Sequence, residues 1–282
     1  MATTRKIAVI ATGWYFPKHF FRAIAEQKMP DGWSADLFCV SHRDPSFALD
    51  ERAGWFKDLG FNRRELYDRL LYDQIATVAE IESFGWKYLL EPNLIGDMGN
   101  VNQWLEKYDH KEYDKFLFTH DDNFILSDGM FLDILPQEGW LVMSNSNGHA
   151  QRRLRTWFGL PKEVEIRGSF EFFTREMMDI IGGKFDMSTV TLSREGATDN
   201  PKNLTDLTDW NQTTQPLMRQ IRTQNLLPRI HYLSKFYRMS KYCLEGERGF
   251  VYKTEISNTK EEERGLDAVE QYYRDHPGEA FL

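Results

Sequence analysis

Short apolar runs and helical patterns alternate along the first half of the chain. Residues 7–12 and 35–40 are largely apolar and have the length of buried strands, and residues 18–27 between them carry apolar side chains at helical spacing. A strand, a helix and a second strand at this spacing form a βα unit. We therefore predict an α/β fold of three layers, α/β/α, with a mostly parallel central sheet.

The same patterns predict most of the remaining elements. Helices are expected over residues 62–84, 93–107, 127–135, 174–181, 209–224 and 261–273, and strands over 88–90, 115–123, 139–144, 168–173 and 228–233. Gly182 and Gly183 follow the fourth of these helices and are typical of a helix C-cap. We expect a single domain over residues 1–256 and a charged helical tail over residues 257–282.

Polar residues and a glycine follow the first two predicted strands. They are Thr12, Gly13, Ser41, His42, Arg43 and Asp44. Ligands of open α/β sheets bind outside the carboxyl ends of the strands, so we expect these residues to gather on one edge of the sheet. Gly-x-Gly-x-x-Gly does not follow the first strand, which weakens a dinucleotide-binding interpretation, and the sequence contains no P-loop motif.

The predicted strand over residues 115–123 carries the most informative motif of the chain. Its apolar part ends in two consecutive acids, Asp121 and Asp122. Two carboxylates at the end of a buried strand are costly unless something cationic lies against them. A divalent cation shared with bound phosphates would meet this need. Alternatively, one of the acids caps the helix expected over residues 127–135, and the pattern leaves both interpretations open.

Composition narrows the functional class. A net charge of −8 and an isoelectric point near 5.5 argue against a nucleic-acid partner, although a nucleotide held through a metal remains compatible. Two cysteines in 282 residues indicate a reducing compartment rather than a disulfide scaffold. No apolar run reaches the roughly 20 residues of a membrane span, and no signal-peptide pattern is present at the start. We expect a cytoplasmic protein without a transmembrane segment, and a peripheral membrane contact stays open.

Four segments follow one another in an informative order within residues 5–235. They are the first strand with its polar end (7–13), a Gly/Asn-rich segment (96–102), the strand that ends in acids (116–123), and a strand, helix and Gly-Gly-Lys-Phe-Asp segment (168–186). Together they resemble the GT-A class of sugar-nucleotide-dependent glycosyltransferases, most of all the family 2 group. The resemblance implies a GT-A-like nucleotide-binding fold, with a nucleotide-binding half over about 1–123 and an acceptor half over about 124–256.

The resemblance also implies a reaction and a site. A sugar would move from a nucleoside diphosphate sugar to a saccharide or other hydroxyl acceptor, with Mn²⁺ or Mg²⁺ as cofactor. The residues expected to line the pocket for the base and ribose are Thr12, Gly13, Arg43, Asp44 and Asn100.

The acid motif departs from the Asp-x-Asp of that class, because it reads His120-Asp121-Asp122-Asn123. Either His120 stands in for the first acid or Asn123 stands in for the second. We expect Asp122 to bind the metal and Asp121 to contact the ribose or a metal-bound water. His231 is expected to complete the coordination of the ion.

An inverting transfer needs a carboxylate that takes the proton of the acceptor hydroxyl. The Glu-Asp pair that supplies it in the family is missing after residue 186. We expect Asp209, at the start of the helix over residues 209–224, to be this base, although it is equally suited to be an ordinary N-cap. The rival acids are Asp206, Asp199 and Glu195.

Two other functions stay open. A sugar-phosphate nucleotidyltransferase would need a Gly-rich basic loop after the first strand, and residues 11–17 contain one glycine and no arginine. A non-catalytic carbohydrate-binding protein on the same fold is compatible with the irregular acid motif.

Overall fold

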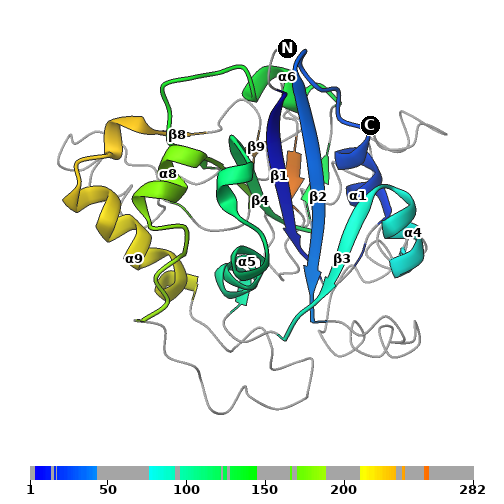
Figure 1. Cartoon of the computed structure of the whole chain (residues 1–282), viewed down its shortest axis with the longest axis horizontal. Coiled ribbons are helices and arrows are strands. Elements are labelled where there is room, and N and C mark those ends of the chain that lie inside the picture. Colours follow the sequence, from blue (N-terminus) through cyan, green and yellow to red (C-terminus); the bar gives the residue numbers. More distant parts are fainter. Residues whose placement is uncertain are drawn as a thin grey trace, which may run out of the picture.

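A seven-stranded sheet forms the centre of the structure (Figure 1). The computed structural model of the chain describes residues 4–13, 16, 18–42, 76–92, 96–121, 123–125, 128–144, 166, 170–188, 210–232, 237–238 and 251–253. In spatial order the strands are β3 (Trp86–Leu90), β2 (Trp33–Ser41), β1 (Arg5–Thr12), β4 (Lys115–His120), β7 (Phe170–Thr174), β6 (Val142–Ser144) and β8 (Ile230–Tyr232). Only β7 runs antiparallel to its neighbours among these seven strands, which confirms the mostly parallel sheet.

Helices cover both faces of the sheet (Figure 1). The first face carries α1 (Lys18–Ala25), α4 (Val78–Ser83) and α6 (Met130–Ile134), and the second carries α5 (Gly96–Lys107), α8 (Arg175–Ile180) and α9 (Trp210–Thr223). Short 3₁₀ turns lie at His110–Glu112 and Leu227–Arg229. The predicted α/β fold with three layers is therefore confirmed.

Each face has its own hydrophobic core because side chains alternate along the strands. On β1, Ile7 and Val9 join the core beneath α1, α4 and α6, whereas Ala8 and Ile10 join the core beneath α5, α8 and α9. All four side chains are fully buried. A strand that is buried on both faces has a continuous apolar sequence, and this is why the sequence predicted β1.

Local sequence signals set the ends of two helices. Thr77 and Glu80 form a capping box at the start of α4, in which each side chain binds the main-chain N–H of the other residue. After α8, the N–H groups of Gly182 and Gly183 donate to the carbonyls of Asp179 and Met178, at 3.0 and 2.7 Å. Both glycines have positive φ, so the pair forms the C-cap that the sequence predicts.

Most predicted elements are present, with some differences at their ends. The expected strands appear as β1 to β4 and β6 to β8, and the helices expected over 18–27, 93–107, 127–135, 174–181 and 209–224 appear as α1, α5, α6, α8 and α9. The helix expected over 62–84 is described only at its end, as α4. The tail over 257–282, with its expected helix, lies outside the described residues. Among the described helices, none combines the length and the apolar composition needed to span a membrane.

A second, three-stranded sheet was not predicted. It pairs β5 (Asn123–Ile125) with β10 (Val251–Lys253), and β10 with β9 (Tyr237–Arg238). The expected strand over 115–123 is therefore two strands, because β4 ends at His120 and β5 begins at Asn123. Strands of two or three residues carry no periodic signal, and the pairing of β5 with β10 joins segments more than 100 residues apart in the sequence.

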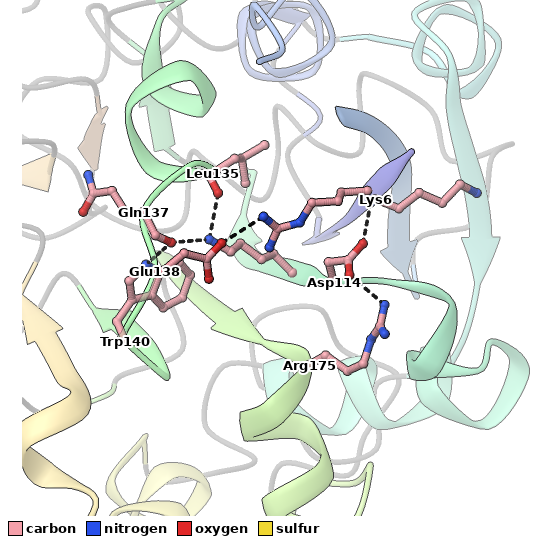
Figure 2. A network of polar contacts seen from close by, with 9 residues as sticks. Lys6, Asp114, Leu135, Gln137, Glu138, Trp140 and Arg175 are labelled. Carbon is pink, nitrogen blue, oxygen red and sulfur yellow. Dashed lines mark hydrogen bonds and ion pairs between the residues drawn. The ribbon is translucent and has the colours of Figure 1, made fainter. Parts of the chain in front are cut away.

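At the amino-terminal edge of the sheet, the side chain of Lys115 is almost completely buried (1% exposed). Its ammonium group donates to the carbonyl oxygens of Leu135 (2.8 Å) and Gln137 (2.6 Å) (Figure 2). It also lies 4.4 Å from the ring centroid of Trp140. These contacts hold the segment that follows α6 against the start of β4. They lie at the opposite end of β4 from Asp121.

Candidate active site

The candidate site lies between β1 and β4, where the strand order reverses. From β1 the chain adds β2 and β3 on one side, and then crosses to β4 on the other side of β1. The helix that follows β1, α1, packs on one face of the sheet, and the helix that precedes β4, α5, packs on the opposite face (Figure 1). In open α/β sheets, ligands bind outside the carboxyl ends of the strands at such a switch point.

Main-chain hydrogen bonds tie three strand ends together at this edge. Gly13, the residue after β1, donates its N–H to the carbonyl of Val40 on β2 at 3.1 Å. Asp121, the residue after β4, donates its N–H to the carbonyl of Thr12 at 3.2 Å. The structure therefore brings Thr12, Gly13 and Asp121 together, and the side chains of Thr12 and Asp121 are both buried there.

The carboxylate of Asp121 has an unexpected partner. Its Oδ2 accepts the main-chain N–H of Phe16 at 2.7 Å, and the residue is 3% exposed. Asp121 does not cap α6, because that helix begins after Gly129 and the N–H of its first residue, Met130, donates to Oε1 of Gln27 at 3.0 Å. The acid instead binds the main chain at Phe16, four residues after β1 ends.

Polar residues of β2 reach the same edge. Ser41 is the last residue of β2 and His42 follows it, as the strand-end pattern predicts. Burial lowers the pKa of His42 from its ordinary value of 6.5 to about 4. The imidazole is therefore neutral at physiological pH, and this corner of the site carries no histidine charge.

Asn100 lies in α5, the helix that precedes β4, and it is 6% exposed. Its side-chain oxygen Oδ1 is buried and has no hydrogen-bond partner among the described residues. A buried acceptor without a donor is costly, and such atoms are rare in native proteins. An N–H or O–H group of a ligand would satisfy it.

Sequence reasoning missed a buried acid on β7. Glu171 lies on β7 between Phe118 of β4 and Ser144 of β6, and it is fully buried. Its Oε2 accepts the main-chain N–H of Phe170 at 3.0 Å, and the hydroxyl of Ser144 lies 3.4 Å from its Oε1. The available signal was an acid between phenylalanines in a strand with both faces buried.

Several predicted site residues lie outside the described part of the chain. They are Arg43, Asp44, Asp122 and Asp209, together with the rival acids Glu195, Asp199 and Asp206. The described part of the chain resumes directly after Asp209, because α9 begins at Trp210.

His231 lies far from Asp121, the one of the two acids that the structure describes. It is an exposed residue on β8, and β8 is three strands away from β4 in the sheet. Neighbouring strands are about 4.8 Å apart, so the two strands are separated by about 14 Å. Ligands of one ion lie within about 2.0–2.6 Å of it, so the structure gives no support for an ion shared by His231 and the end of β4.

Carboxylate oxygens, such as those of the acids that follow β4, are ligands that hard divalent cations prefer. Mg²⁺ and Mn²⁺ sites in nucleotide-dependent enzymes use one or two carboxylates together with substrate phosphates. Within the described residues, no group of three or more histidine, cysteine or acidic side chains could form a cage made of protein ligands alone.

Comparison with known proteins finds weak structural likeness. No protein family and no curated protein matches the sequence. The galactosyltransferase LgtC, solved with donor and acceptor sugar analogues, is 10% identical, with a TM-score of 0.41 over 88% of this chain and 86% of LgtC. The glycosyltransferase GlyE of Streptococcus pneumoniae TIGR4 is 9% identical, with a TM-score of 0.41 over 97% of this chain and 64% of GlyE.

TarS of Staphylococcus aureus, solved with UDP, is 11% identical, with a TM-score of 0.42 over 88% of this chain and 60% of TarS. The chain thus spans less than two thirds of the GlyE and TarS structures. Likenesses of this degree decide neither the family nor the activity of the chain.

Proposed function

We propose that this chain is a metal-dependent glycosyltransferase that moves a sugar from a nucleoside diphosphate sugar to a saccharide or other hydroxyl acceptor. The observation that carries the proposal is the joining of the turn after β1 to the end of β4 at the switch point of the sheet. This arrangement places Gly13 beside Asp121, the first of two consecutive acids, in a sequence without a dinucleotide or P-loop motif. It agrees with the resemblance of the sequence to the GT-A class.

The nucleotide of the donor would bind along the carboxyl edge of β1 and β2. Thr12 and Gly13 lie there, and Arg43 and Asp44 follow β2 in the sequence. Asn100 supports this assignment, because its buried Oδ1 needs a donor and nucleobases and riboses carry N–H and O–H groups.

Asp122 is the proposed metal ligand. Asp122 would hold a divalent ion, and such an ion would supply positive charge against the leaving diphosphate. We leave His231 out of this site, because β8 is three strands from β4.

Asp209 is the proposed base of an inverting reaction. The first helical residue of α9 is Trp210, so the sequence sets an acid at the position that starts this helix. A base so placed would take the proton of the acceptor hydroxyl as that oxygen attacks the sugar. Asp209→Asn keeps a side chain that caps a helix nearly as well, so the variant separates a base from a cap. We expect it to slow turnover by about 10²–10⁴-fold with donor affinity retained.

The test of the whole proposal is hydrolysis and transfer with a panel of donors. UDP-glucose, UDP-galactose and GDP-mannose are incubated with the full chain, with Mn²⁺ or with chelator, and release of the nucleoside diphosphate is measured. We expect release with one donor that depends on the metal and is lost in Asp122→Ala.

Asp133→Ala is the matched control, because Asp133 is an exposed acid of α6 that no part of the proposed site includes. The proposal fails if no donor is bound or cleaved, or if Asp122→Ala keeps normal activity. Formation of a nucleotide sugar from a sugar 1-phosphate and a nucleoside triphosphate would point instead to a nucleotidyltransferase. Sugar binding without donor turnover would point to a carbohydrate-binding protein.

A further inference from the structure

The two consecutive acids after β4 have separate tasks. We infer that Asp121 is a positioning residue, which holds the main chain at Phe16, four residues after β1 ends, and thereby supports the proposed nucleotide site beside Gly13. Contact with the metal and the donor then falls to Asp122. The inference rests on the proposed function, and it replaces the direct ribose or water contact that the sequence predicts for Asp121.

The first support is the hydrogen bond from Phe16 to Asp121. The distance of 2.7 Å from the main-chain nitrogen to Oδ2 is short, as expected when an ionised carboxylate accepts an N–H in a buried place. Phe16 has φ of +57°, a backbone conformation that bulky L-residues rarely adopt. A residue in this conformation persists only where its surroundings hold it, and Asp121 supplies one such restraint.

The second support comes from the other side of Phe16. Its carbonyl accepts the N–H of Ala76 at 2.7 Å, so both of its main-chain groups are bound. Its ring is fully buried and packs edge-on against Phe21 and Tyr88, with centroids 6.0 and 5.8 Å away. Phe16 therefore connects two segments through its main chain, since its N–H is bound by Asp121 at the end of β4 and its carbonyl by Ala76 before α4.

The third support is the glycine that follows β1. A Cβ atom at Gly13 would lie 3.1 Å from Oδ2 of Asp121 and 3.3 Å from the ring of Phe16. A side chain at position 13 would therefore be in tight contact with the carboxylate and would require it or the ring of Phe16 to shift by a few tenths of an ångström. Gly13 and Asp121 are far apart in the sequence but lie side by side in the structure, and both are close to Phe16.

Substitutions of a positioning residue should have different effects from substitutions of a metal or donor ligand. Asp121→Asn keeps an oxygen that can accept the N–H of Phe16, although a neutral acceptor binds it about half as strongly as a carboxylate. Asp121→Ala removes the acceptor altogether. A ligand of a cation, by contrast, loses its function when its charge is removed, and Asp122→Asn should do so.

The experiment measures amide hydrogen exchange at Phe16 and titrates the protein with UDP and GDP in the presence of Mn²⁺. We expect Asp121→Ala to lower the protection of the Phe16 amide and nucleotide affinity by about 10- to 100-fold, and Asp121→Asn to lower both by about 3- to 10-fold. Asp122→Asn should abolish the effect of Mn²⁺ on affinity while the Phe16 amide stays protected.

The inference is overturned if Asp121→Asn removes the effect of Mn²⁺ as Asp122→Asn does while protection at Phe16 is unchanged. It is also overturned if Asp121→Ala leaves that protection intact. Should Asp121→Ala fail to fold, Gly13→Ala tests the same contact through hydrogen exchange alone, because its Cβ would lie 3.1 Å from Oδ2 and should lower protection at Phe16. Nucleotide affinity is not the readout for this variant, because Gly13 itself lies in the proposed nucleotide site. If the wild-type protein binds no nucleotide, the proposed function fails, and exchange at Phe16 still decides whether Asp121 holds the turn.

Discussion

The side-chain amide of Asn102 pairs with the main chain of Phe185 in the way that one strand pairs with another. Its Oδ1 accepts the N–H of Phe185 and its Nδ2 donates to the carbonyl of the same residue, both at 2.9 Å. Asn102 is buried in α5, and Phe185 lies just beyond the glycine cap of α8. The Gly-Gly-Lys-Phe-Asp segment is therefore fixed to the helix that precedes β4.

Asn102→Ala should destabilise the fold strongly. It removes both hydrogen bonds and leaves a buried N–H and a buried carbonyl of Phe185 without their partner, which costs about 2–4 kcal/mol of unfolding free energy. Urea denaturation measures this loss. Asn100→Ala is the matched control, since Asn100 lies on the same helix and is equally buried at 6%. Its buried Oδ1 has no described partner, so we expect a cost below about 1 kcal/mol. Equal losses in the two variants would contradict the pairing.

The glycines after α8 allow a second comparison. Gly182 and Gly183 have φ of +73° and +70°, so alanine at either position carries the cost of a left-handed residue, about 1–2 kcal/mol. A Cβ at Gly182 meets nothing within 4 Å, whereas a Cβ at Gly183 would lie 2.7 Å from Cε1 of His110. The imidazole of His110 is held by Asp179, at 2.9 Å, and cannot move away freely. Thermal unfolding should therefore show a larger loss for Gly183→Ala than for Gly182→Ala.

The double variant Gly183→Ala/His110→Ala tests the cause. Removing the imidazole removes the clash, so part of the loss caused by Gly183→Ala should disappear in the His110→Ala background. If the two changes add independently, the steric explanation is incorrect and only the backbone conformation matters.

The sequence was sufficient for the sheet because its signals are local. The apolar runs of β1 and β2 and the spacing in α1 need no knowledge of distant contacts, and the glycine cap after α8 is visible as Gly182-Gly183. The strand-end rule also predicted correctly that Thr12 and Gly13 lie at the edge where β4 ends.

The partners of the site residues could not be predicted in the same way. Asp121 binds the N–H of a residue 105 positions earlier, and no pattern near Asp121 distinguishes this contact from a helix cap. Glu171 was missed because an acid within a strand usually points to solvent, whereas β7 is buried on both faces. His231 was assigned from its order in the chain, and order does not reveal that β8 is the outermost strand.

The buried imidazole of His42 should make stability depend on mildly acidic pH. Its pKa of about 4 in the folded protein lies below the ordinary 6.5, so between these values the unfolded chain binds more protons than the folded one. The stabilising contribution is complete above pH 6.5 and is lost as the pH falls toward 4. We expect the unfolding free energy to rise from pH 4.5 to 6.5, by an amount on the order of 2 kcal/mol from this group.

Urea denaturation across this range, on the wild-type protein and on His42→Gln, measures the effect. Glutamine keeps hydrogen-bonding groups but does not titrate, so the variant should show a flatter dependence on pH. An unchanged slope in His42→Gln would assign the dependence to other groups.

Lys115 should produce a signature of the same sign at alkaline pH. Burial lowers the pKa of its ammonium group from 10.5 to about 8, an effect that Arg5 strengthens and that Glu138 and Asp114 oppose. Between pH 8 and 10.5 the unfolded chain therefore binds more protons than the folded one, and the contribution of Lys115 to stability rises with pH. It is complete above 10.5 and is lost as the pH falls through 8.

The contacts of Lys115 explain why the fold should tolerate the loss of this proton. The neutral amine keeps two hydrogens, and the two described carbonyl acceptors are those of Leu135 and Gln137. Lys115→Met removes both hydrogen bonds and the buried charge together. The difference in unfolding free energy between the wild-type protein and Lys115→Met, measured in urea at pH 7, 8, 9 and 10, should grow as the pH rises. A difference that shrinks with pH would mean that the charged form is the one that stabilises this edge of the sheet.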